Sequence, residues 1–183
     1  KGIGMGLYKS ACCVKIDGEV KDLRTVLNND CDFEVMTFDS KDGKKAFWHT
    51  ASHILAQAVK RLYPSVKLAI GPAIDNGFYY DFARKEPFTT EDFARIEEKM
   101  HEIVKRDEKI ERIVMPRNEA IKFFKDKGEH YKAEIIEDLP ESETISLYRQ
   151  GDFTDLCRGP HVPSTGKIGN AFKLTKVAGA YWR

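Results

Sequence analysis

The sequence lacks any apolar run approaching the roughly 18 residues that a membrane-spanning helix needs. It also lacks an excess of charge of either sign, because 30 Lys and Arg residues stand against 29 Asp and Glu residues, for a net charge of +1. These absences argue against a membrane partner and against a global electrostatic attraction to nucleic acid. Any contact with nucleic acid must therefore come from a local basic surface.

Cysteine is scarce: Cys12, Cys13, Cys31 and Cys157 are the four in the chain, and their spacing is not that of a disulfide framework. Adjacent Cys12 and Cys13 are poorly placed to pair with each other. We therefore expect free thiols and a reducing, cytoplasmic location. The opening residues also lack the apolar stretch of a secretory signal, and the chain begins at Lys1, so we expect a fragment of a longer protein.

The first quarter of the chain has the alternation typical of strands. We predict strands over residues 11–16, 19–23 and 31–38, with Asp17-Gly18 as a type I′ hairpin turn between the first two. This segment is too short for a core of its own and resembles the back half of a small β-rich domain. A polar, Gly-containing linker is expected at residues 40–45, which predicts a domain boundary at 43/44.

Beyond residue 44 the pattern alternates between helix and strand periods without a strict βαβ rhythm. Amphipathic helices are predicted over 47–62, 90–107 and 117–127, and a hairpin is predicted around residues 75–77. Strands are predicted at 110–115, 132–136, 144–148, 171–175 and 178–182. Helices and strands mixed in this way favour an α+β fold, with helices packed on a mainly antiparallel sheet.

Two pairs of polar side chains with four-residue spacing stand out. His49 and His53 lie in the first predicted helix, where i and i+4 share one face. Cys157 and His161 flank a Gly-Pro step, which cannot lie inside a regular helix and predicts a turn. If folding brings the two pairs together, three imidazoles and a thiol form a site for water activation or for a tetrahedral metal.

Long motifs around these residues resemble the editing domain of threonyl-tRNA synthetases. They occupy residues 47–56, around the first His pair; 69–81, around the expected hairpin; and 155–163, around the Cys/His turn. Residues 10–38 resemble the latter part of the TGS domain of that family, a ubiquitin-like β-grasp. The closing residues 173–183 resemble the junction at which the aminoacylation domain of the family begins.

The resemblance implies a partial TGS domain at residues 1–43 and an editing domain at residues 44–183. The activity it implies is hydrolysis of serine wrongly esterified to threonine tRNA, with the acceptor end of that tRNA as the partner. The resemblance also implies that editing needs no cofactor and that ATP serves only the aminoacylation domain, which we expect to be missing here. Full-length members of the family are expected to be homodimers.

The chemistry of the two amino acids explains why such an activity is needed. Threonine and serine differ by one methyl group, which contributes only about 1–3 kcal/mol to selection in a binding pocket. That difference supports a selectivity of roughly 10- to 200-fold. A second, hydrolytic site sized for the smaller amino acid increases the overall selectivity.

Roles follow from residue chemistry and from the matching family positions. His49, with an ordinary imidazole pKa of about 6.5, is suited to accept a proton from water. Lys132 matches the catalytic lysine of the family and can orient water, stabilise an oxyanion or protonate the leaving ribose oxygen. His53, Cys157 and His161 are expected to line the seryl pocket. Residues assigned to substrate binding are Tyr80 and Asp155, which match family positions that bind the seryl and adenosine ends, and Arg158. Arg158 and Lys176 are weaker candidates, for contact with the tRNA backbone.

Two other interpretations of the chain remain open. His49, His53, Cys157 and His161 form a valid tetrahedral zinc set, and related alanyl-tRNA editing proteins use this constellation for zinc. The threonyl branch implies a metal-free site, and a closed four-ligand zinc leaves no position for catalytic water. The alternative functions are a structural zinc domain, which the ligand chemistry suggests, and a tRNA-binding module without turnover, which the absence of the other expected domains suggests.

Overall fold

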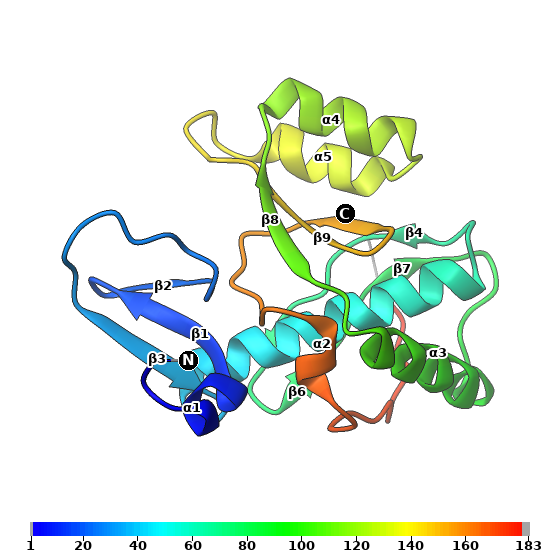
Figure 1. The fold of residues 1–183 in the computed structure, drawn as a ribbon. Coiled ribbons are helices and arrows are strands. Elements are labelled where there is room, and N and C mark those ends of the chain that lie inside the picture. The colour runs from blue at the N-terminus through cyan, green and yellow to red at the C-terminus, as the bar shows by residue number, and fades with distance from the viewer. Residues whose placement is uncertain (1, 181–183) are drawn as a thin grey trace.

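The computed structural model describes residues 2–180 and contains mixed helices and antiparallel strands, as the predicted α+β class requires (Figure 1). The N-terminal part forms a three-stranded antiparallel sheet in the order β2-β1-β3. The turn between β1 and β2 has Asp17 at φ 47° and Gly18 at φ 85°, the conformation of the predicted hairpin. The elements of this part are α1 (Met5–Ser10), β1 (Ala11–Ile16), β2 (Glu19–Lys21) and β3 (Phe33–Thr37).

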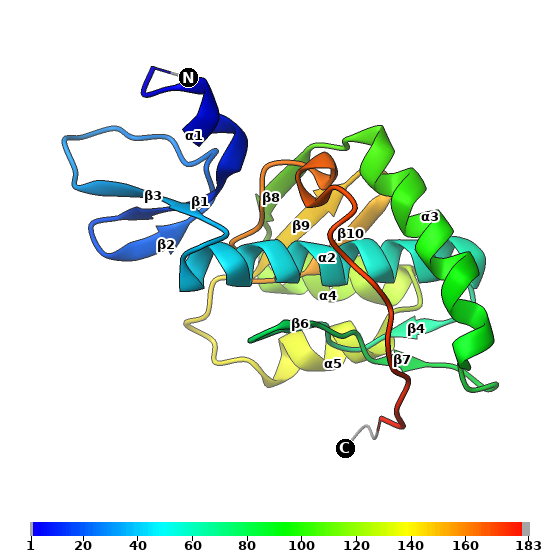
Figure 2. The same cartoon turned by 90° about the horizontal axis from the view of Figure 1, so that it is seen from below.

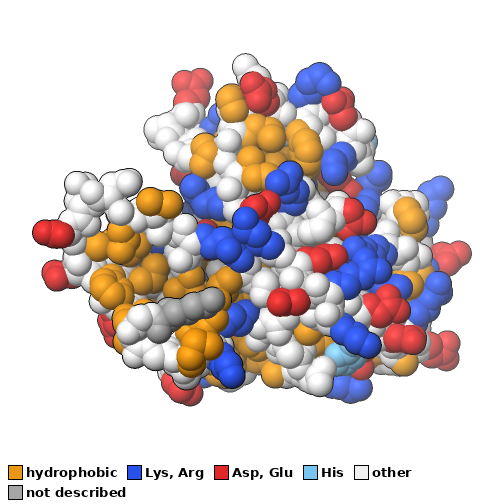
Figure 3. Space-filling view, viewed as in Figure 1, with side chains coloured by type: hydrophobic (Ala, Val, Ile, Leu, Met, Phe, Trp, Pro, Cys, Tyr) orange, Lys and Arg blue, Asp and Glu red, His pale blue; other side chains and the backbone are white. Residues whose placement is uncertain are grey.

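One face of this small sheet packs against the start of the long helix α2 (Lys41–Leu62). Cys13, Met36 and Ala46 form the buried cluster between them. Hydrophobic side chains also gather on the outer surface of this part of the molecule (Figure 3). Val26 and Phe33, which are 75% and 51% exposed, belong to this N-terminal segment. The small sheet thus has a core only where α2 covers it.

Helix α2 begins earlier than the sequence predicts, so the expected linker at residues 40–45 is wrong. Ser40 is the N-cap, and its hydroxyl accepts a hydrogen bond from the Gly43 amide at 3.0 Å. Gly43 lies so close to β3 that a Cβ would be 2.0 Å from the Thr37 carbonyl oxygen. The polar residues that suggested a linker therefore form the N-cap and first turn of helix α2. The domain boundary at 43/44 itself stays a prediction.

The larger part of the molecule has three layers (Figures 1 and 2). Its sheet has the order β10-β9-β8, with every pairing antiparallel. On central strand β9, Leu147 packs toward α4 and α5, whereas the next residue, Tyr148, joins the core beneath α2 and α3. The elements are α3 (Phe93–Arg106), β8 (Ile110–Val114), α4 (Arg117–Asp126), α5 (His130–Asp138), β9 (Ser146–Gln150) and β10 (Phe153–Leu156).

Short strands between α2 and α3 form the edge of this part. β4 (Lys67–Leu68) pairs with β7 (Phe82–Ala83), and β5 (Ala73–Ile74) pairs with β6 (Gly77–Phe78). The second pairing confirms the hairpin predicted around residues 75–77. Two 3₁₀ turns complete the described elements, η1 (Thr90–Asp92) before α3 and η2 (Thr165–Ile168).

Two predicted strands are wrong. Residues 132–136 belong to helix α5, in which Ala133 and Ile136 lie one turn apart and are buried against α4. Residues 171–175 have no regular structure, and the strand predicted at 178–182 extends outside the described residues. Among residues 2–180, no helix combines the length and the apolar character that crossing a membrane requires.

Candidate active site

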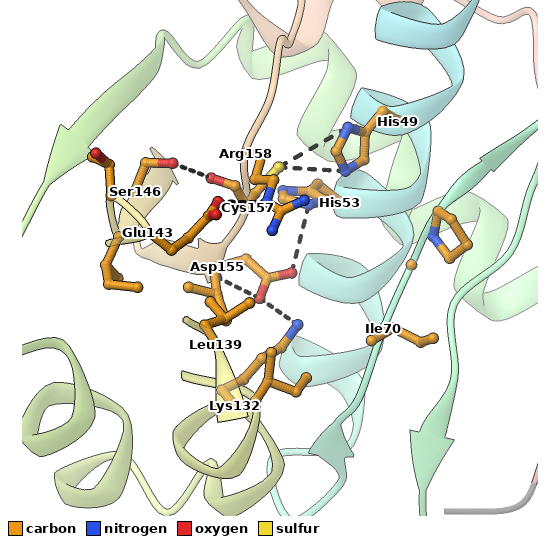
Figure 4. Close-up of a pocket in the computed structure, with 16 residues that line it drawn as sticks. His49, His53, Ile70, Lys132, Leu139, Glu143, Ser146, Asp155, Cys157 and Arg158 are labelled. Carbon is orange, nitrogen blue, oxygen red and sulfur yellow. Dashed lines mark hydrogen bonds and ion pairs between the residues drawn. The ribbon is translucent and has the colours of Figure 1, made fainter. Parts of the chain in front are cut away.

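The two polar pairs meet where α2 passes the turn that follows β10. Figure 4 shows three of the four side chains, His49, His53 and Cys157. Cys157 Sγ lies 3.3 Å from His49 Nε2 and 3.1 Å from His161 Nε2. The ring centroid of His161 is 4.4 Å from that of His49 and 4.3 Å from that of His53. One helix turn separates His49 from His53, so helical periodicity directs both rings to the same side of α2. Folding thus assembles three imidazoles and one thiol.

His161 is held by a residue that the sequence did not single out. Thr50 Oγ1 lies 2.9 Å from His161 Nδ1, and it accepts a hydrogen bond from the Val162 amide at 3.1 Å. Both Thr50 and His161 are buried. The only sequence signal for Thr50 is its place between the two motif histidines. A threonine in a helix more commonly bonds its own backbone, and Thr50 also does so, to the Ala46 carbonyl at 2.9 Å.

A second group of charged and polar side chains lies beside the histidines. Lys132 Nζ, from α5, is 2.8 Å from Asp155 Oδ1 at the end of β10. The Tyr80 hydroxyl donates to Asp155 Oδ2 at 2.6 Å, and His53 Nε2 lies 3.6 Å from the same oxygen. The Leu156 amide also donates to Asp155 Oδ1, at 2.8 Å. The buried carboxylate of Asp155 therefore links three parts of the chain: helix α5, helix α2, and the segment between β6 and β7.

A cavity of about 470 Å³ opens onto these side chains. Its polar end contains His49, His53, Lys132, Asp155 and Cys157, and Arg158 stands at its rim. Apolar side chains line the rest of the cavity: Ile70, Pro72, Ile135, Leu139, Ile145 and Leu156. A cavity with convergent polar groups at one end and apolar walls is the usual form of a site for a small organic group.

The remaining predicted residues lie around this cavity in different ways. Tyr80 and His161 do not line the cavity. Tyr80 lies behind Asp155 and contacts it, and His161 lies behind Cys157 and contacts it. Arg158 is 72% exposed and pairs with Glu143 at 2.8 Å, both at the cavity wall. Lys176 is exposed in the C-terminal segment and is not part of the wall. Ser146, which the sequence did not single out, donates to the Cys157 carbonyl at 2.6 Å.

Burial controls the charge of the site. It lowers the pKa of His49 to about 3, with help from neighbouring His53, and lowers the pKa of His53 to about 4. Burial also lowers the pKa of His161 well below its usual range. All three imidazoles are therefore neutral at pH 7. A base this weak orients water by accepting a hydrogen bond better than it removes a proton, which differs from the role expected for an unperturbed His49.

The other titratable groups are shifted in directions that match their contacts. Burial raises the pKa of the Cys157 thiol, so the sulfur is protonated at neutral pH. Burial opposes the charge of Asp155, but the Lys132 ammonium and His53 outweigh it and lower the pKa of this carboxyl. Burial and Asp155 together raise the pKa of Tyr80 well above its usual range. The polar end of the cavity thus presents the Lys132 ammonium, the buried Asp155 carboxylate and neutral hydrogen-bonding groups.

The donor set fits a zinc ion in its chemistry. One potential ligand atom from each of His49, His53, Cys157 and His161 lies within 4.8 Å of the others. Nδ1 of His53 is buried without a hydrogen-bond partner. Nδ1 of His161 is already bonded to Thr50, which leaves its Nε2 facing the sulfur. Three nitrogens and one sulfur in this arrangement are a suitable tetrahedral set, so the zinc interpretation of the sequence stays open.

Comparison with known proteins gives one consistent result. Residues 145–180 match the family described as the threonyl and alanyl tRNA synthetase second additional domain. The chain is 60% identical over its full length to the threonine–tRNA ligase of Acetivibrio thermocellus and 57% identical to that of Caldanaerobacter subterraneus. Over 181 residues it is 60% identical to the threonine–tRNA ligase of Clostridium tetani. The chain spans 29% of the length of the first relative and 28% of the other two.

Proposed function

We propose that this chain hydrolyses the ester bond of mischarged tRNA. The chain is homologous along its whole length to a segment of the threonine–tRNA ligases. The general editing role follows from the match to the second additional domain of threonyl and alanyl tRNA synthetases. The finer proposal is that the substrate is serine esterified to the 3′ end of threonine tRNA. Homodimerisation of full-length relatives and a cytoplasmic location stay predictions from the sequence.

The polar end of the cavity is the observation that carries this proposal. Hydrolysis of an ester needs a group that orients water, a positive charge near the carbonyl oxygen, and room for the alcohol that leaves. Neutral His49 and the ammonium of Lys132 supply the first two. The remaining volume, with walls such as Ile70 and Leu139, offers apolar surface to the terminal nucleoside.

The reaction can be written with the residues in place. A water molecule that donates a hydrogen bond to His49 attacks the carbonyl carbon of the ester. The ammonium of Lys132 stabilises the oxyanion that develops on the carbonyl oxygen. The bond between the carbonyl carbon and the ribose oxygen then breaks, with one proton of the water ending on the ribose oxygen and the hydroxyl on the acyl group. Free serine and uncharged tRNA are the products.

Side-by-side deacylation of Ser-tRNA and Thr-tRNA tests the proposal. We expect the chain to hydrolyse the seryl ester at least about tenfold faster, the lower end of what one methyl group supports. His49→Ala should lower the rate for the seryl ester, whereas His101→Ala should not, because His101 is exposed on α3 and stacks on Phe172. Equal rates for the two esters would disprove the seryl specificity. An unchanged rate in His49→Ala would remove this site from the reaction.

A further inference from the structure

The small N-terminal sheet contributes a side chain to the support of the site. Asp22 follows β2, and one of its carboxylate oxygens accepts the His161 amide N–H at 2.9 Å. The other oxygen accepts the Tyr148 hydroxyl at 2.6 Å. One carboxylate of the N-terminal segment thus holds both the backbone of a site histidine and the side chain packed beside it.

Tyr148 transmits this contact to the turn that carries Cys157 and His161. Its ring centroid lies 4.5 Å from that of His161, and its side chain is almost completely buried. A Cβ on Gly159 would lie 2.0 Å from the Tyr148 hydroxyl oxygen, so the turn is seated directly on this group. Burial and the hydrogen bond to Asp22 raise the pKa of Tyr148, so the phenol stays protonated and keeps donating.

A second contact from the same segment reaches the far end of the turn. The Arg24 guanidinium donates to the Pro163 carbonyl at 3.0 Å. Asp22, Arg24, Tyr148, His161 and Pro163 also line a second cavity of about 370 Å³ between the small sheet and the larger part of the molecule. Asp22 itself is only half-buried. Its contacts are therefore hydrogen bonds at the edge of a cavity, and shortening its side chain removes no core packing.

We propose that Asp22 is a positioning residue for ester hydrolysis, by which the N-terminal sheet sets the place of the Cys157–His161 turn against helix α2. This inference rests on the proposed function of the site. The His161 backbone is fixed by Asp22, its Nδ1 by Thr50 and its ring by Tyr148, while its Nε2 meets Cys157. Loss of one of these restraints lets the turn drift, and a displacement of about 1 Å can cost up to about 100-fold in rate.

Asp22→Ala in this chain tests the inference with two separate measurements. Hydrogen exchange at the His161 amide reports the hydrogen bond without reference to any activity, and we expect it to become at least about tenfold faster. For Ser-tRNA deacylation we expect kcat to fall roughly 10- to 100-fold while KM for the tRNA changes little, because Asp22 does not line the cavity that we propose for the substrate. Asp30→Ala, which removes an exposed carboxylate of the same segment, is the matched control.

Asp22→Asn separates positioning from charge. The amide oxygen can still accept the His161 N–H, and its NH₂ group can donate to the Tyr148 oxygen, so we expect most of kcat to return. Faster exchange in Asp22→Ala with unchanged kcat would overturn the positioning role and leave the proposed function intact. A wild-type chain without hydrolysis would remove both. If Asp22→Ala fails to fold, Tyr148→Phe, which removes only the hydrogen bond between the Tyr148 hydroxyl and Asp22, must show the loss of kcat.

Discussion

Lys132 Nζ lies 2.8 Å from Asp155 Oδ1, and the two side chains are only 4% and 1% exposed. The pair joins helix α5 to strand β10 at the polar end of the cavity. A buried ion pair of this kind is costly to break from one side, because the remaining charge stays in a poorly solvating environment. It therefore links the stability of the fold to the charge that the proposed reaction uses.

Asp155→Asn should destabilise the chain and abolish ester hydrolysis. Removing one partner of a buried pair typically costs about 3–5 kcal/mol, so we expect a fall of that order in the free energy of unfolding. The control is Glu137→Gln, which breaks an exposed pair with Lys125 at the same N–O distance of 2.8 Å and should cost no more than about 1 kcal/mol. Urea denaturation measures both. Similar losses of unfolding free energy in the two variants would show that the buried pair stabilises the fold no more than the exposed pair does.

Folding stability should decrease as the pH falls below about 6.5. His49 and His53 have folded-state pKa values of about 3 and 4, below the usual value, so the unfolded chain binds protons first. Their contribution is complete above pH 6.5 and is lost as the pH falls toward 4, by up to about 1.4 kcal/mol per pH unit for each group. The lowered pKa of Asp155 acts at lower pH, where its contribution is lost as the carboxylate is protonated.

Denaturant unfolding at pH 7.5, 6.0 and 5.0 measures this dependence, with His53→Gln as the variant that removes one of the groups. The decrease in stability between pH 7.5 and 5.0 should be smaller in the variant than in the wild type. His101→Gln, at a histidine exposed on α3, is the control variant. A wild-type stability that stays constant over this range would contradict the assignment of neutral imidazoles at His49 and His53.

Tyr80→Phe should weaken the site through Asp155. The tyrosine hydroxyl donates to the buried carboxylate at 2.6 Å, and its loss leaves one oxygen with the distant His53 alone. We expect a loss of about 1–3 kcal/mol in stability, the usual cost of an unsatisfied buried acceptor, and slower deacylation. Tyr79→Phe is the matched control, because the neighbouring side chain is 41% exposed. Thermal unfolding and deacylation rates are measured for both variants, and only Tyr80→Phe should show the losses.

Added zinc should inhibit hydrolysis. An ion that engages His49, His53, Cys157 and His161 occupies all four of its positions and takes His49 away from water. Deacylation should therefore slow when zinc is added and recover with a chelator. Cys157→Ser should weaken zinc binding measured by calorimetry, and Cys31→Ser, a substitution away from this group, should not. Activity lost on chelation and restored by zinc would support the opposite interpretation, that the metal takes part in the reaction.

Some of the site was predictable because the signal is local. The spacing of His49 and His53 in an amphipathic segment places both rings on one helix face, whatever the rest of the fold does. The Gly-Pro step between Cys157 and His161 predicts a turn for a similarly local reason. Lys132 was assigned to a strand because a short apolar pattern does not distinguish the two periods. In the structure this segment is a helix that packs against α4.

Other parts of the site had no signal in the sequence. Asp22 lies 139 residues from His161, and nothing about a carboxylate after a short strand indicates that it holds that backbone. Arg158 was expected to meet the tRNA backbone, but its pairing with Glu143 depends on how two loops come together. The low pKa of His49 likewise comes from burial, which composition and spacing do not reveal.

By itself, the sequence determined which chemical groups the chain offers, the helix face that carries two of them and the family that its motifs resemble. These depend on residue type and on neighbours within a few positions, where backbone geometry sets the arrangement. Tertiary structure alone decided that the histidines are neutral, that Lys132 pairs with Asp155 and that the N-terminal sheet supports His161. Each of these depends on burial and on contacts between residues far apart along the chain, and both exist only after the layers have packed.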